Sequence, residues 1–229
     1  TESVTDASDP ALNYDGTALA CLGDTGRSLY FLSGGKGQYL VKNKKMTAPS
    51  FDSFGWLWVA ESDGAVRAYN AASTNEKERS KGIEIPVSWR SGMTFSSLRI
   101  SHDGARVVVV GTRDGTAAVV MSGVVRDSSG TPKGFTEPVR VTSSITPRTA
   151  VWAGEQNLVV VNDKTGESEV TTLSGEETKF DRLDGVKSVS AAGNTSNMLA
   201  HRSDGSCYVL EERGWNRLNT STREMSFAG

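Results

Sequence analysis

The sequence comprises 229 residues, with 25 Lys and Arg against 27 Asp and Glu and a formal net charge of −2. Nucleic-acid binding requires a basic surface, so this balance argues against nucleic acid as the main partner. With 37% hydrophobic residues, the chain can bury the core of one large all-β domain or two small ones. No apolar run is long enough to span a bilayer, and Thr1 is not followed by a signal-peptide pattern. We therefore expect any targeting segment or lipid anchor to lie outside this chain.

Short apolar segments separated by Asp-Gly and related turns recur along the chain in five units. Residues 1–10 are polar and irregular, and we expect them to form a lead-in that helps to close the fold. Residues 11–229 are expected to form one domain. The second turn of each unit falls at an aspartate, and the mean spacing of about 45 residues is typical of a four-stranded propeller blade. These aspartates are Asp24, Asp63, Asp114, Asp163 and Asp204.

In chain order, the second strands of the units are predicted at Ala18–Leu22, Trp56–Ala60, Arg106–Val110, Asn157–Val161 and Asn197–His201. These strands show little alternation, most clearly at Trp56–Ala60, which indicates neighbours on both faces. An immunoglobulin-like sandwich would alternate regularly, whereas blades packed face to face enclose such strands. Two polar segments, Asn70–Gly82 and Arg126–Glu137, are predicted as loops inserted inside blades two and three, and they account for the uneven spacing. We predict an all-β fold, a five-bladed β-propeller of mostly four-stranded blades, with six blades as the main alternative.

Residues suited to catalysis or metal binding are sparse. The two histidines, His102 in a predicted turn and His201 at the end of a strand, are expected at the surface or at a strand edge. The chain lacks a Gly-x-Ser-x-Gly nucleophile elbow, a phosphate-binding glycine loop and Cys/His metal spacing. The entries of the innermost strands, where a propeller glycosidase would place paired acids, offer one acid, Asp9, and two bases, Arg148 and Lys187. We therefore predict no enzyme activity, no catalytic residues, no cofactor and no metal site.

The five tryptophans raise the question of an interaction surface. Trp56, Trp58 and Trp152 lie in predicted strands, where burial between blades is expected. Trp89 and Trp215 lie near outer strands or loops, so we predict them as candidate exposed anchors for a partner.

The two cysteines, Cys21 and Cys207, fall in the first and the last unit, which are neighbours in a closed ring. A disulfide between them would join the two ends of the ring. The alternative is a pair of buried thiols that pack as small apolar side chains. Of the two we favour buried thiols, because a disulfide also requires matching strand directions.

Three segments carry a resemblance to a known family: Phe54–Val59, Leu98–Val110 and Ala150–Val160. They are similar to segments of the C-terminal β-propeller domain of the actinobacterial lipoprotein LpqB. The final Phe227-Ala228-Gly229 is also similar to the way that family ends. The resemblance extends over nearly the whole chain, and the Trp-Leu-Trp-Val segment is its most specific part.

The resemblance implies a context that the residues alone do not. LpqB-like proteins carry a lipidated Cys and a GerMN-like domain before the propeller, and they lie on the outer face of the cytoplasmic membrane. The implied partners are that N-terminal domain and the extracellular region of the sensor histidine kinase MtrB, with modulation of the MtrA–MtrB two-component system as the implied role. The expected function is therefore a non-catalytic extracytoplasmic interaction domain. The alternative is a propeller that binds or hydrolyses cell-wall glycan or peptide.

Overall fold

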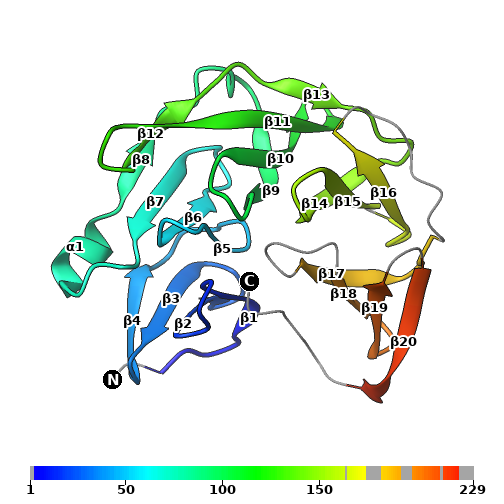
Figure 1. Cartoon of the computed structure of the whole chain (residues 1–229), viewed down its shortest axis with the longest axis horizontal. Helices are drawn as coiled ribbons and strands as arrows, with labels where there is room; N and C mark the ends of the chain where they lie inside the picture. Colours follow the sequence, from blue (N-terminus) through cyan, green and yellow to red (C-terminus); the bar gives the residue numbers. More distant parts are fainter. Residues whose placement is uncertain (1–2, 163, 174–181, 192–197, 212–213, 222–229) are drawn as a thin grey trace.

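The computed structural model describes residues 3–162, 164–173, 182–191, 198–211 and 214–221. Five antiparallel sheets follow one another around a common centre as the blades of a propeller (Figure 1). The blades succeed each other in chain order, from blade 1 in blue to blade 5 in orange and red. The predicted five-bladed, all-β propeller is therefore confirmed.

Blade 1 consists of β1 (Ser8–Leu12), β2 (Ala18–Gly23), β3 (Ser28–Ser33) and β4 (Lys36–Val41). Blade 2 consists of β5 (Ser50–Phe51), β6 (Trp56–Ala60), β7 (Val66–Asn70) and β8 (Ile83–Ile85). Blade 3 consists of β9 (Thr94–Ile100), β10 (Arg106–Arg113), β11 (Thr116–Arg126), β12 (Pro132–Phe135) and β13 (Val139–Val141). Blade 4 contains β14 (Pro147–Ala153), β15 (Asn157–Asn162) and β16 (Ser168–Thr172). Blade 5 contains β17 (Val186–Ala191), β18 (Met198–Arg202), β19 (Ser206–Glu211) and β20 (Gly214–Ser221).

The two predicted insertions differ in structure. The first holds a short helix, α1 (Glu76–Lys81), which buries no side chain and is capped by Asn75, whose Oδ1 accepts the Lys77 N–H at 3.0 Å. Both insertions were predicted as loops, and this is wrong for α1 in the first and for β12 in the second. Strand β11 is 11 residues long, so its final residues extend past β13 and pair with β12 instead.

The second strand of blade 2 is enclosed on both faces, as its composition predicts. Leu57 and Val59 of β6 pack in the cluster shared with blade 1. Trp58 and Ala60 point the other way, into the cluster shared with blade 3. All four are fully buried, and each large apolar side chain of this kind contributes about 1.5–3 kcal/mol on burial. Successive side chains of a strand point to opposite faces of the sheet. Because both faces of β6 are apolar, the strand packs against blade 1 on one side and blade 3 on the other.

The N-terminal lead-in is shorter than predicted, because β1 already begins at Ser8. The residues before it lie along blade 1. The Thr5 carbonyl accepts the Asp24 N–H at 3.1 Å, and the Tyr39 hydroxyl donates to the Ser3 carbonyl at 3.2 Å. A role for residues 1–10 in closing the ring stays a prediction, since residues 1–2 and 222–229 lie outside the described part.

Cys21 and Cys207 are both buried, and no disulfide joins them. Cys21 pairs with Tyr30 within the β2–β3 ladder, and Cys207 pairs with His201 at the end of the β18–β19 ladder. The expectation that His201 lies at the surface or at a strand edge is wrong, because only 6% of it is exposed. Its strand, β18, is flanked by β17 and β19 and so lies inside its sheet. In the described part of the chain, no helix is long and apolar enough to cross a membrane.

The turn aspartates hold their turns by accepting hydrogen bonds. Asp24, Asp63, Asp114 and Asp204 lie in turns as predicted, and Asp163 lies outside the described residues. Asp63 is typical, because its Oδ1 accepts the Ala65 N–H at 2.9 Å. A bond from a neighbouring hydroxyl lowers the pKa below the ordinary value in four exposed turn carboxylates: Asp15, Asp24, Asp127 and Asp204.

The lowered pKa values predict a loss of stability in acid. The unfolded chain takes up protons at these carboxylates near pH 4, before the folded chain does, so their contribution is complete above about pH 5 and decreases below about pH 4. Urea unfolding midpoints measured across this range should fall on acidification. Asp127→Asn should make the decrease shallower. A midpoint that rises below pH 4 would contradict the assignment.

Candidate interaction surface

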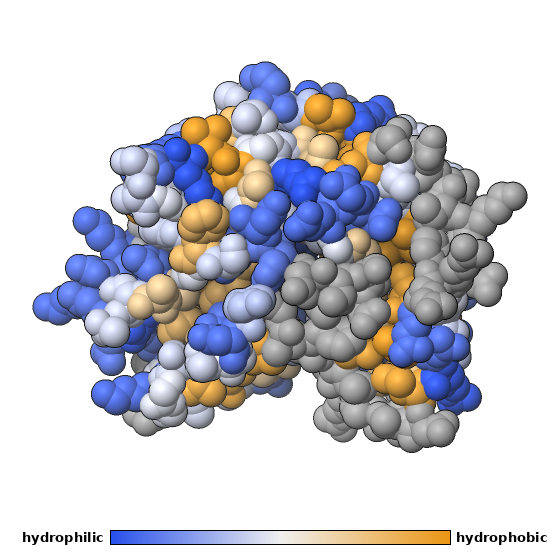
Figure 2. Space-filling view, in the orientation of Figure 1, coloured by the Kyte–Doolittle hydropathy of each residue, from blue (hydrophilic) through white to orange (hydrophobic). Residues whose placement is uncertain are grey.

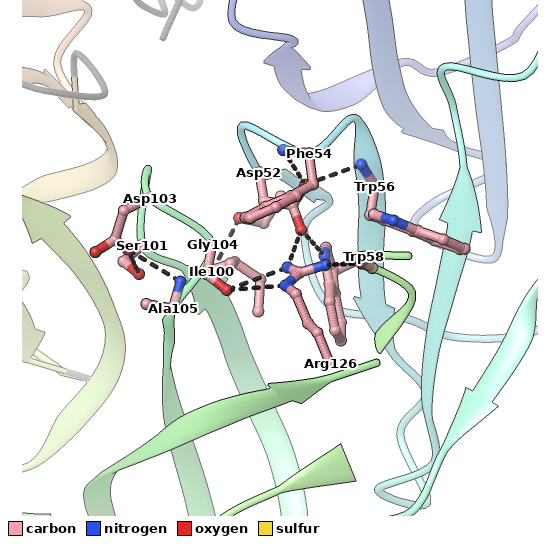
Figure 3. Close-up of polar contacts among 12 residues, drawn as sticks. Asp52, Phe54, Trp56, Trp58, Ile100, Ser101, Asp103, Gly104, Ala105 and Arg126 are labelled. Atoms are coloured by element: carbon pink, nitrogen blue, oxygen red, sulfur yellow. Dashed lines mark hydrogen bonds and ion pairs between the residues drawn. The ribbon is translucent and has the colours of Figure 1, made fainter. Parts of the chain in front are cut away.

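The turn between β5 and β6 is organised by Asp52, which is 4% exposed. Its Oδ1 accepts the backbone N–H groups of Phe54 and Trp56, both at 2.9 Å (Figure 3). Gly55 completes the turn with a φ of +78°, where a Cβ would come within 2.8 Å of the Ala72 Cβ. This geometry directs the Phe54 side chain outward.

The second oxygen of Asp52 connects two blades. Oδ2 accepts the indole N–H of Trp58 at 2.8 Å and the Arg126 Nη2 at 2.6 Å. The Asp52 side chain is fully buried and the Arg126 side chain is 10% exposed. Both carboxylate oxygens are thus committed to structural donors, which makes Asp52 unsuited to proton transfer or metal binding. The pair is a buried, fully hydrogen-bonded link between blade 2 and blade 3.

Arg126 in turn supports an exposed aromatic ring. Its Nη1 donates to the Gly130 carbonyl at 2.9 Å and its Nη2 donates to the Gly104 carbonyl at 3.1 Å, so the guanidinium plane is fixed. The Phe54 ring lies 4.3 Å from the centre of that plane, a cation–π contact. A Cβ on Gly104 would come within 2.8 Å of the same ring. Phe54 is nevertheless 52% exposed.

Two further rings lie beside Phe54 on the equivalent turns of blades 1 and 3. Tyr14 is 59% exposed, and its ring centroid lies 4.8 Å from that of His102. The Ser53 N–H donates to the His102 carbonyl at 3.1 Å, which ties the Phe54 turn to the His102 turn. We call Tyr14, Phe54 and His102 the aromatic face. On the face shown in Figure 2, hydrophilic side chains alternate with small hydrophobic patches. A few aromatic anchors therefore suit this surface better than a broad apolar interface.

The residues predicted as exposed anchors lie elsewhere. Trp89 and Trp215 are half-buried, not exposed. Trp89 packs on Phe95 and Phe135, at centroid distances of 6.0 and 6.3 Å, and Trp215 packs on the cluster between blades 4 and 5. Both rings fill space between blades, as Trp58 and Trp152 do. Sequence reasoning missed Tyr14 and Phe54, because a single aromatic residue in a turn gives no periodic signal.

The centre of the ring brings together the strand entries singled out in the sequence. Asp9, Arg148 and Lys187 line one cavity of about 320 Å³. A second cavity of about 130 Å³ shares Arg99 and other lining residues with it and is also lined by Asp52, whose oxygens are already engaged. The described lining therefore offers no free pair of carboxylates for glycoside hydrolysis. Within the described residues, no group of three or more His, Cys, Asp or Glu side chains is placed to hold a metal ion.

Comparison with known proteins identifies the family. The family model of the lipoprotein LpqB β-propeller domain matches residues 1–225. The chain belongs to this family. Lipoprotein LpqB of Streptomyces avermitilis is 27% identical over 171 residues. That match covers 68% of this chain and 27% of the relative, so the chain spans only part of the length of the curated relative.

Solved propellers show the same fold at low identity. A streptogramin B lyase has a TM-score of 0.60 and 9% identity, over 97% of this chain and 72% of its own. Virginiamycin B lyase from Staphylococcus aureus gives 0.59 and 10%, over 96% and 71%. Regucalcin from Agrobacterium tumefaciens, described as a calcium-binding protein, gives 0.58 and 14%, over 95% and 75%. At such identities the likeness concerns architecture alone, because one fold carries many functions.

Proposed function

We propose that this propeller is a non-catalytic protein-binding domain of an LpqB-like lipoprotein anchored on the outer face of the cytoplasmic membrane. In this proposal it associates with the extracellular region of the sensor histidine kinase MtrB and modulates the MtrA–MtrB two-component system. The GerMN-like N-terminal domain of the full-length lipoprotein is its second partner. Membership of the LpqB family supports the lipoprotein context. The aromatic face is the observation that carries a binding role.

The aromatic face has the properties of interface anchors. Aromatic side chains dominate binding energy at protein interfaces, and rigid ones lose little conformational entropy on binding. Phe54 rests on a guanidinium held by two carbonyls and a buried carboxylate. Tyr14 rests on His102. Phe54 and Tyr14 are thus exposed on ordered supports before a partner arrives, and His102 is half-buried beneath Tyr14.

Substitution of the exposed rings tests this proposal. Tyr14→Ser and Phe54→Ser should each weaken retention of the purified domain on the immobilised kinase extracellular region about tenfold or more. Tyr14→Ser should leave the melting temperature nearly unchanged, because its ring is mainly in solvent. Val139→Ser is the matched control, since Val139 is 60% exposed on the outer strand β13. It should bind like the wild type.

Two results would overturn the proposal. One is equal loss of binding in Val139→Ser and Tyr14→Ser, which would remove the aromatic face as the binding site. The other is no retention of the wild-type domain, together with saturable binding of muropeptides or glycans. That result would favour the alternative function, a propeller that binds cell-wall glycan or peptide.

A further inference from the structure

The cavity at the centre of the ring concentrates positive charge. The larger, 320 Å³ cavity is lined by Arg99, Arg148 and Lys187 from blades 3, 4 and 5, with Asp9 of blade 1 as the single acid. We call it the basic cavity. Its size lies at the lower end of small-molecule sites, which measure about 300–1,000 Å³. The whole chain is slightly acidic, so this concentration of cations is local and not a consequence of composition.

Arg99 lies where the two central cavities meet, since it lines both. Its Nη1 donates to the carbonyls of Ala48 and Pro49, at 3.0 and 2.7 Å. These carbonyls fix the side chain, but they leave the other guanidinium N–H groups without a partner among the described residues. Burial lowers the pKa of Arg99, and only the charge of Asp9 opposes that shift. A cation is thus held in a partly desolvated position without a paired anion.

Arg148 has a similar arrangement one blade further on. Its Nη2 donates to the carbonyls of Val186 and Lys187, at 3.0 and 3.1 Å. Its Nε is enclosed and lacks a hydrogen-bond partner in the described structure. Because this nitrogen is enclosed by the protein itself, Arg148 contributes to the cavity through its positive charge and not through this donor.

Hydroxyl groups also line the basic cavity. Ser97 and Thr149 line the basic cavity, and their hydroxyl oxygens lie 2.9 Å apart. Lys187 is exposed, and no described carboxylate pairs with it or with either arginine. Guanidinium groups bind carboxylate and phosphate oxygens through several donors at once, whereas an ammonium adds a point charge. The donors of the cavity therefore match an oxyanion, with Lys187 able to attract it.

The smaller cavity, which shares Arg99 with the basic cavity, is lined in part by apolar side chains. Phe51, Ile100, Val151 and Trp152 line it, and Arg99 lies at its junction with the basic cavity. An acidic group held at the arginines would therefore point a short apolar portion toward these side chains. This arrangement favours a small organic anion over a bare inorganic ion.

We propose that the basic cavity binds a small ligand through a carboxylate or phosphate group, held by Arg99 and Arg148 and attracted by Lys187. The alternative is purely structural, in which the two arginines only connect neighbouring strands through backbone carbonyls. The two readings differ in a measurable way, because only the first gives saturable anion binding. The basic cavity shares no lining residue with the aromatic face, of which only His102 lines the smaller cavity. The inference can therefore be tested independently of the kinase proposal.

Isothermal titration calorimetry of the purified domain tests this inference with sodium succinate and with inorganic phosphate. Sodium chloride at matched ionic strength and the neutral analogue succinamide serve as ligand controls. Saturable heats with either oxyanion, and none with succinamide, are expected. Preference for succinate would assign a carboxylate ligand, and preference for phosphate would assign a phosphate ligand. Absence of saturable heat with both oxyanions would overturn the proposal.

Variants locate the site. Lys187→Gln should weaken binding about fivefold and Arg148→Gln about tenfold or more, because each removes a charge from the cavity. Lys187 is exposed, and its side chain makes no hydrogen bond or ion pair with the described residues, so its variant should fold normally even if Arg148→Gln does not. Lys164→Gln, the same charge change on the exposed β15–β16 turn, should bind like the wild type. Equal weakening in Lys164→Gln and Lys187→Gln would show a general charge effect and contradict the assigned site.

Discussion

Asp52→Ala is expected to destabilise the domain by about 3–5 kcal/mol, which is the usual cost of removing one partner of a buried ion pair. The change leaves Arg126 with a buried, unpaired charge. It also leaves the backbone N–H groups of Phe54 and Trp56, and the indole N–H of Trp58, without their acceptor. Urea unfolding followed by tryptophan fluorescence would measure the loss. The signal is direct, because Trp58 itself belongs to the network.

Asp63→Ala is the matched control for that substitution. Asp63 lies in the other turn of the same β6-containing blade and accepts one backbone hydrogen bond, from Ala65, while remaining exposed. Its loss should cost only about 0.5–1.5 kcal/mol. Similar destabilisation by the two substitutions would show that the Asp52–Arg126 link contributes no more than an ordinary turn.

Gly166→Ala is the second substitution with a large expected effect, about 3 kcal/mol of destabilisation from a left-handed backbone and an overpacked contact together. Gly166 lies in the turn between β15 and β16 with a φ of +66°. A Cβ there would meet the Val186 nitrogen at 2.7 Å and the Val186 oxygen at 2.8 Å. Because these atoms are backbone, no side-chain rotation relieves the clash. The Gly166 carbonyl also accepts the Val186 N–H at 3.0 Å, so the junction of blades 4 and 5 should loosen.

Gly205→Ala separates the two causes. Gly205 also has a positive φ, +84°, but a Cβ there would meet no atom within 4 Å. This substitution should therefore show the backbone strain alone, about 1 kcal/mol. Thermal or urea unfolding of both variants gives the comparison. Equal losses would mean that the close approach to Val186 has no energetic consequence.

Features encoded by neighbouring residues were predictable from the sequence. The apolar run at Trp56–Ala60 predicted a strand enclosed on both faces, and its side chains divide between two inter-blade clusters. The Asp-Gly turns predicted the hairpins and hence the number of blades. Such signals are local, because each depends on the period of a strand or the dihedral angles of a turn.

Features that depend on contacts between blades were not predictable. Asp52 and Arg126 are 74 positions apart, and the residues around each of them give no signal that the two side chains pair. Trp89 and Trp215 were predicted as exposed because they lie in outer regions of the chain, yet they fill spaces formed only when blades meet. The strand entries Asp9, Arg148 and Lys187 could be predicted only in part. The blade pattern placed them around the ring centre, but the enclosed Nε of Arg148 required the structure.

The order of strand pairing has a consequence for folding. In the described sheets, each ladder joins strands that follow one another in the chain, with one exception. Strand β13 pairs directly with β11, although β12 lies between them in the sequence. Closing such short loops costs little chain entropy, and each hairpin can form once its own residues are available. A chain emerging from its N-terminus can therefore build its blades one after another. We expect contact between blade 1 and blade 5 to form last, because blade 5 is the last to be made, and we expect that step to limit the rate at which the ring closes.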